Sequence, residues 1–357
     1  MQTRRYDIDW LRVIAIGFLL IYHVAIPFQP WGVFIGFIQS PESIESLWVP
    51  MSLLSIWRIP LLFFVSGMGV YFSMRKRNWK KLLTERTQRI LLPFIIGTIL
   101  IVPLQVFLWQ VYYHQDLKPQ FHPAHLWFLG NIFSYVILLV PLLFYMKKKQ
   151  DTLRIKLAKL VDHPVKLLLW TIPFIGQSLL IDPEHYTMYA LTFHGYVLGF
   201  LAFFLGYLFV YTGDVFWHTV NKWKWSFLFL GFVLYFVRLL YFDMESPVFL
   251  MSIETLIWIY ALLGLGFKYL NFSNSYLSYL SEVAYPVYIL HWIFIHLGSL
   301  LLFPMELAPM LKFIGLVIFT FGGSLITYHV LIRRVFLLRP LFGLKNSSKG
   351  RRISLTV

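Results

Sequence analysis

Two ionisable residues, Arg12 and His23, lie within one hydrophobic segment of the sequence, WLRVIAIGFLLIYHVAIPF. An ionisable side chain near the middle of a membrane helix costs about 2.5–3.5 kcal/mol on insertion scales, and such residues therefore usually serve a function. At roughly 100° and ~1.5 Å per residue, the two side chains leave one face of a helix about 16 Å apart. The spacing predicts a cation near one membrane surface and a titratable imidazole deeper inside.

These residue types suit general-base chemistry beside an anion-binding group. A neutral imidazole can take the proton of a hydroxyl nucleophile, an effect typically worth about 10²–10⁴-fold in rate. For His23 we favour this catalytic role over the alternative, a hydrogen bond between helices. For Arg12 two interpretations stay open, ligand binding and snorkelling of the guanidinium to the lipid headgroups.

The composition places the whole chain in a membrane. Hydrophobic residues make up 59% and charged residues only 13%, with a mean hydropathy of +0.69, unlike soluble globular domains. The absence of cysteine excludes disulfides, cysteine–zinc sites and thiol catalysis. A net charge of +15 would favour nucleic-acid binding in a soluble protein, but here its distribution indicates membrane orientation. We therefore expect membrane lipids as neighbours and no nucleic-acid partner.

Ten segments are long and apolar enough to span a bilayer. We expect an all-α integral membrane protein, a bundle of about ten transmembrane helices, and we expect the first segment to be retained rather than cleaved. The expected segments are 10–28, 48–74, 90–112, 125–146, 166–182, 188–211, 226–242, 247–269, 282–303 and 310–335.

Basic residues are concentrated in every second loop between these segments, which places them on one side of the membrane. The loops on one side contain a single lysine, Lys118, and the positive-inside rule then places both termini in the cytoplasm. We expect one polytopic domain over residues 1–340 and a basic cytoplasmic tail over 341–357. The basic clusters on the cytoplasmic side lie at 75–89, 147–159, 221–224 and 333–352.

Further polar or small residues mark the other segments. In the second segment, Ser66, Gly67 and Gly69 would let another backbone approach closely. Arg86 and Arg89 are three residues apart, so they share a helix face and suit a clamp on phosphates. The remaining candidates are Arg58, His125, Trp127, Arg238, Glu254, Tyr285, Tyr288 and His291.

Five short motifs follow one another along the chain. They are the pair Arg12 and His23, LFFVSG at 62–67, the stretch with Arg86, Arg89 and Pro93, HLWFL at 125–129, and YPVYILH at 285–291. Together they resemble the membrane-bound acyltransferase-3 family over residues 7 to about 343. The stretches RIPLLFFVSG and RPLFG further resemble its glucan biosynthesis protein C group.

The resemblance implies a transmembrane O-acyltransferase of the bacterial inner membrane. It would move an acyl group, acetyl or succinyl, from cytoplasmic acyl-CoA to a hydroxyl of an extracytoplasmic carbohydrate, without a metal. His23 would be the general base, with His291 as a second catalytic candidate. The CoA phosphates would bind Arg12, Arg86 and Arg89. The acceptor-binding candidates are Arg58, His125, Trp127, Arg238 and Tyr288.

Several of these residues keep an alternative role. Arg86 and Arg89 would otherwise be topogenic charges beside anionic lipid. For His125, acceptor binding and a structural role are equally favoured. For His291, catalytic support and packing are equally favoured.

Arg58 and Arg238 also have two interpretations each. Either arginine binds the outer carbohydrate, or it forms an ion pair with Asp243 or Glu254, because a buried charge needs a partner. The sequence does not decide between these roles.

A zinc site is not expected. His114, His122 and His125 lie close in sequence, but their spacing is irregular and no fourth ligand is evident.

A second function class remains, a multi-pass transporter or a flippase for a lipid-linked glycan. Such proteins often contain internal repeats with helix breaks at corresponding positions, and we find no repeat here. The oligomeric state is left open, with a homo-oligomer as one option.

Overall fold

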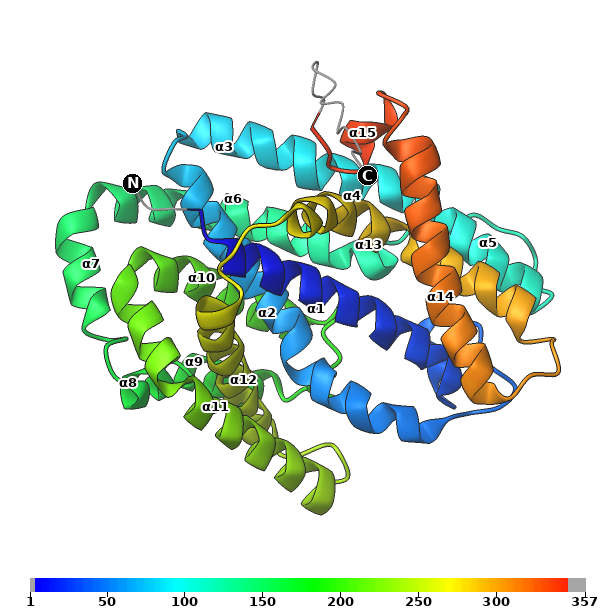
Figure 1. The fold of residues 1–357 in the computed structure, drawn as a ribbon, viewed down its shortest axis with the longest axis horizontal. Helices are drawn as coiled ribbons and strands as arrows, with labels where there is room; N and C mark the ends of the chain where they lie inside the picture. The colour runs from blue at the N-terminus through cyan, green and yellow to red at the C-terminus, as the bar shows by residue number, and fades with distance from the viewer. Residues whose placement is uncertain (1–3, 346–357) are drawn as a thin grey trace.

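The computed structural model describes residues 4–345, and within this range the chain is helical and contains no strand (Figure 1). Ten helical segments in this range are long and apolar enough to cross a membrane, which confirms the expected integral membrane bundle. Residues 346–357, most of the expected basic tail, lie outside the described range. The helices are α1 (Tyr6–Ala25), α2 (Trp48–Met74), α3 (Trp79–Arg86), α4 (Leu92–Ile96), α5 (Val102–Tyr112), α6 (Trp127–Lys148), α7 (Gln150–Ala158), α8 (Pro164–Leu169), α9 (Ile172–Ile181), α10 (Phe193–Tyr211), α11 (Asp214–Tyr241), α12 (Val248–Tyr269), α13 (Ser275–Leu302), α14 (Pro309–Thr327) and α15 (Leu338–Leu341).

Helices α11 and α13 are longer than the hydropathy pattern predicts. Helix α11 begins at Asp214, twelve residues before the expected start at 226, and includes the basic stretch 221–224. Helix α13 begins at Ser275, where the side chain of Asn274 accepts a hydrogen bond from the Leu277 amide at 2.7 Å. Hydropathy reports where a helix enters the apolar layer, whereas capping and backbone hydrogen bonds decide where it begins. The seventh helix is therefore longer than the expected segment 226–242.

The third span is one helical segment, Trp79–Tyr112, of mixed α-helical and π-helical geometry. Two π-helical segments, Thr87–Leu91 and Gly97–Ile101, separate α3, α4 and α5. Pro93 and Pro103 lie in the first turns of α4 and α5, where the missing proline N–H does least harm. The wider π-helical turns accommodate the carbonyl groups that proline cannot pair.

Small residues hold α2 against α10. A Cβ atom at Gly67 would overlap the carbonyl of Phe203, and one at Gly206 would overlap the carbonyl of Phe64. The predicted close approach at Gly67 is confirmed, whereas a Cβ at Gly69 would meet nothing within 4 Å. Membrane helices gain little from apolar burial against each other, so this backbone contact is a main source of packing energy.

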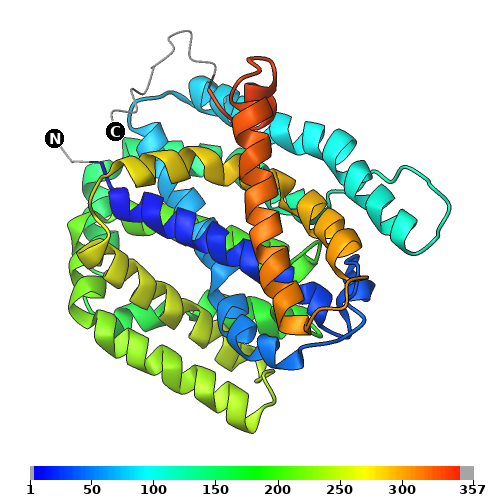
Figure 2. The same cartoon turned by 45° about the vertical axis from the view of Figure 1, so that its right-hand side comes forward.

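Helix α1 packs against α2, α12 and α13 (Figure 2). Its buried side chains include Leu11, Ala15 and Leu19. This packing turns the face of α1 that carries Arg12 and His23 toward α13 and α2. Helix α1 therefore forms one wall of the interior cavity.

Candidate active site

One cavity of about 1450 Å³ runs between α1, α2, α6 and α13. Arg12 and His23 both line it, as their shared helix face predicts. At one end, which we call the basic end, its wall includes Arg4, Arg12, Arg86, Arg89, Arg339 and Lys345. At the opposite end, its wall includes Phe34, Gln120, His122, His185 and Glu245.

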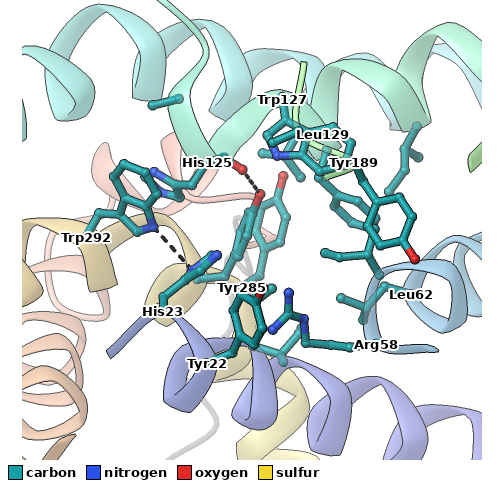
Figure 3. Close-up of a pocket in the computed structure, with 18 of the residues that line it drawn as sticks. Tyr22, His23, Arg58, Leu62, His125, Trp127, Leu129, Tyr189, Tyr285 and Trp292 are labelled. Carbon is teal, nitrogen blue, oxygen red and sulfur yellow. Dashed lines mark hydrogen bonds between the residues drawn. The ribbon is translucent and has the colours of Figure 1, made fainter. Parts of the chain in front are cut away.

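His23 and His291 form a pair deep in this cavity. Nδ1 of His23 lies 2.8 Å from Nε2 of His291, and the rings are parallel within 5°. The indole nitrogen of Trp292 lies 3.2 Å from the same Nδ1 atom (Figure 3). Sequence reasoning gave both histidines as separate candidates and did not predict the pair, and it missed Trp292 although this residue directly follows His291.

The hydrogen bonds of the pair bear on the tautomer of His23. Nδ1 of His291 lies 2.5 Å from the Tyr288 carbonyl, which only accepts, so this nitrogen carries a proton. In neutral His291 the other nitrogen, Nε2, then accepts, and Nδ1 of His23 must donate to it. The Trp292 indole N–H also points at Nδ1 of His23, at 3.2 Å, and it donates there in the opposite tautomer, with Nδ1 as the acceptor. The tautomer in which Nδ1 donates to His291 leaves the lone pair on Nε2, the form that a general base requires.

Helix α13 also holds His125. The Tyr288 hydroxyl donates to the His125 carbonyl at 2.5 Å, and His125 Nε2 donates to the Ile289 carbonyl at 3.1 Å. Nδ1 of His125 is therefore an acceptor, and it is buried without a hydrogen-bond partner among the described residues. Tyr288 and Trp127 line the cavity as well, but the Tyr288 hydroxyl is already used. Of these residues, His125 has free hydrogen-bonding capacity for a ligand.

The three arginines that were predicted to bind phosphates meet at the basic end of the cavity. Arg12 pairs with Asp9 at 2.8 Å, and Arg89 pairs with Glu85 at 3.4 Å. Arg86 keeps only a 3.4 Å contact with the Gly69 carbonyl, and its Nε atom has no partner within the described chain. The structure adds three cations that the sequence analysis did not name as phosphate ligands, namely Arg4, Arg339 and Lys345.

Arg58 and Arg238, which were both candidates for acceptor binding, have different surroundings. Arg238 forms an ion pair with Glu254 at 2.8 Å and donates to the carbonyls of Ser52 and Met244, both at 3.0 Å. It is 1% exposed and is not part of the cavity wall. The structure thus favours the ion pair with Glu254 and gives no support to the expected substrate role of Arg238. Arg58, in contrast, lines the cavity.

The three histidines near residue 120 do not converge. His122 Nδ1 accepts from the Ala124 amide at 3.2 Å, whereas His125 is held by α13. Burial lowers the pKa of His122 below its usual value, so its ring is neutral at pH 7. Among the described residues, no three His, Asp or Glu side chains gather in a way that suits a metal ion.

Ten spanning helices around a cavity with clustered arginines and a histidine pair define a multi-pass membrane protein equipped for chemistry in its interior. The family model described as an acyltransferase domain, that of the acyltransferase-3 family, matches residues 5–329. The chain belongs to this family and is a membrane acyltransferase. Comparison with curated proteins and with solved structures gives no match.

Proposed function

We propose that the protein transfers an acyl group from acyl-CoA, bound at the basic end, to a carbohydrate hydroxyl that enters from the opposite end. The observation that carries this proposal is the single cavity that contains the arginine cluster, His23 and the loops of the opposite end. The basic end would face the cytoplasm under the positive-inside rule. The membrane would be a bacterial inner membrane, as the family resemblance implies.

The arginine cluster suits the phosphates of CoA. Guanidinium groups bind phosphate oxygens in a bidentate way, and several of them at one mouth suit a ligand with several negative charges. From Arg12 the wall of α1 leads to His23, about 16 Å further along the helix axis. A pantetheine arm lying along this wall would bring its thioester to the imidazole.

The histidine pair suits the chemical step. A carbohydrate hydroxyl beside His23 Nε2 would lose its proton to that nitrogen as its oxygen attacks the thioester carbonyl. His291, held by the Tyr288 carbonyl at 2.5 Å, would keep the His23 tautomer in place. The protonated imidazole would then return the proton to the leaving CoA thiolate, so His23 ends the cycle neutral.

The opposite end suits a carbohydrate acceptor. His125 Nδ1 has no partner in the described chain and would accept a hydrogen bond from a sugar hydroxyl. Trp31, Trp48 and Trp127 line the same cavity and offer flat apolar surfaces beside polar groups. Within this acceptor class we favour a periplasmic glucan, because RIPLLFFVSG and RPLFG resemble the glucan group of the family.

The test uses purified protein in liposomes with radiolabelled acetyl-CoA or succinyl-CoA on one side and glucan on the other. We expect label in the glucan, and much less with His23→Ala. The matched control is His194→Gln, because His194 is also buried but does not line the cavity. Movement of a lipid-linked glycan across the bilayer without any label in the product would instead favour the flippase.

A further inference from the structure

Arg58 is a buried cation without a charged partner. It is 4% exposed, lines the cavity from α2, and its Nε and Nη1 atoms have no hydrogen-bond partner among the described residues. No acidic side chain pairs with it in the described part of the chain. Arg238, which is buried to a similar degree, has Glu254 and two carbonyls as partners. A buried guanidinium with free N–H groups is costly, so Arg58 calls for another explanation.

The neighbours of Arg58 in the cavity are neutral. Its guanidinium carbon lies 3.6 Å from the centre of the Tyr22 ring, a cation–π contact, and its Nε and Nη1 atoms stay without a hydrogen-bond partner among the described residues. Tyr189 lies nearby on the cavity wall (Figure 3), and burial raises the pKa of its phenol well above the usual value, so it supplies no negative charge. The missing negative charge must therefore come from the substrate or arise during the reaction.

Arg58 is close to the base. The centre of the Tyr22 ring lies 6.0 Å from that of His23 and 3.6 Å from the Arg58 guanidinium, so base and guanidinium are at most about 10 Å apart. A tetrahedral carbon placed between them would be joined to each group by a hydrogen bond of about 3 Å through one of its oxygens. This arrangement is no longer than the distance of about 10 Å. One carbonyl group can thus lie between His23 and Arg58.

We propose that Arg58 binds the oxyanion of the tetrahedral intermediate in the transfer reaction. This inference rests on the proposed function. As the hydroxyl oxygen bonds to the thioester carbon, its proton goes to His23 Nε2 and the carbonyl electron pair moves onto oxygen, where Arg58 N–H groups stabilise it. The pair then re-forms the carbonyl, the C–S bond breaks, and the CoA sulfur leaves as a thiolate that takes the proton from His23.

A fixed donor is effective for this purpose. Donors that are already oriented toward the developing charge need no reorganisation in the transition state, and removing one such donor typically lowers kcat by about 10²–10³-fold. The contact with Tyr22 holds the guanidinium in place and leaves Nε and Nη1 available. The ground-state thioester is uncharged, so Arg58 would favour the transition state over bound substrate.

The decisive variant is Arg58→Met, which removes the charge and keeps much of the side-chain length. We expect kcat with acetyl-CoA to fall about 10²–10³-fold, while acetyl-CoA binding, measured directly, changes less than about twofold. The ratio of turnover with fluoroacetyl-CoA to turnover with acetyl-CoA should rise, because an electron-poor carbonyl depends less on an external donor. Arg238→Met is the matched control for a structural arginine, with lower thermal stability and an unchanged ratio in the protein that folds.

Other outcomes would overturn the assignment. A loss confined to succinyl-CoA, with acetyl-CoA turnover intact, would mean that Arg58 binds a carboxylate of the donor. A raised KM for the glucan at unchanged kcat would mean that it binds the acceptor. Near-native kcat for Arg58→Met would remove any role in the reaction.

Two further measurements keep the result clear. If Arg58→Met does not fold, Arg58→Lys carries the same test, because it keeps the charge and loses the planar fork. We then expect reduced kcat and a raised fluoroacetyl-to-acetyl ratio, and an unchanged ratio would contradict the proposal. Wild-type protein that transfers no acyl group from any donor would contradict the proposed function itself, whereas an active wild type with an unaffected Arg58 variant contradicts only the role of Arg58.

Discussion

At the scale of single residues, the site depends on which atoms remain free. His23 Nδ1 is committed to His291, His291 Nδ1 to the Tyr288 carbonyl, and the Tyr288 hydroxyl to the His125 carbonyl. Such chains of hydrogen bonds polarise one another and leave few alternative arrangements. This chain of hydrogen bonds leaves the lone pair of His23 Nε2 free to accept a proton.

The histidine pair predicts different effects for its two members. His23→Ala should lower kcat by about 10²–10⁴-fold while acyl-CoA affinity stays near normal, because the imidazole acts in the chemical step. His291→Ala should cost about 10–100-fold, as is typical for groups that orient a functional histidine. His291→Gln should recover part of this loss, since its amide oxygen can accept from His23 Nδ1.

Steady-state kinetics and acyl-CoA binding of the three histidine variants check this prediction. Equal losses for His291→Gln and His291→Ala would contradict the positioning role of His291. A stable, monodisperse His23→Ala protein with near-native transfer would contradict the base.

The arginines at the basic end make a prediction about the donor. Arg86→Ala and Arg89→Ala should each weaken acyl-CoA binding about tenfold, a loss near 1.4 kcal/mol, by removing charge-assisted contacts. Lysine at either position should restore little where the contact is bidentate. Calorimetric titration measures this, with Lys148→Ala as the control from the same side. Unchanged affinity in the double alanine variant would return both arginines to a topogenic role.

At the scale of elements, the cavity exists because neighbouring helices are held at fixed distances. Helix α2 carries Arg58 on the cavity side and Gly67 on the side of α10. In the third span Arg86 is the last residue of α3, and Arg89 lies in the π-helical segment Thr87–Leu91, which shifts its direction relative to a regular α-helix. Changes in helix packing should therefore affect the site from a distance.

The contact between α2 and α10 can be tested with two glycines. Gly67→Ala should destabilise the protein by about 1–3 kcal/mol, because its Cβ would meet the Phe203 backbone and not a movable side chain. Gly69→Ala, two residues further along the same helix, meets nothing within 4 Å and should be neutral or slightly stabilising. Thermal unfolding in detergent compares them, and equal melting temperatures would refute the packing argument.

At the scale of the whole molecule, the even number of crossings places the two ends of the described chain together. Arg4 and Lys345 both line the basic end of the cavity, which is consistent with termini on one side. The spanning segments and the segregation of basic loops then describe one orientation in the membrane.

Orientation can be measured with single cysteines, since the native chain has none. Asp116→Cys, in the loop opposite the basic end, should react with an impermeant maleimide in intact cells. Lys81→Cys, at the basic end, should react only after the membrane is opened. Both positions are exposed, so access to the side chain does not separate them. Labelling of Lys81→Cys in intact cells would reverse the proposed direction of transfer.

The sequence by itself determined the features that depend on neighbouring residues. Hydropathy over about twenty residues defines the spans, the basic loops predict their sides, and the helical repeat places Arg12 and His23 on one face. The five motifs were sufficient to indicate the acyltransferase family, which the family model matches over residues 5–329.

Only the tertiary structure decided which helices are neighbours. His23 and His291, which are 268 positions apart in sequence, are in hydrogen-bond contact. Arg238 forms its ion pair with Glu254 and not with Asp243. Lipid tails are as apolar as leucine, so a membrane helix that is apolar on all sides carries little information about its partner in its hydropathy. Shape, small residues and the few polar contacts settle the pairing, and these become visible only when the helices are brought together.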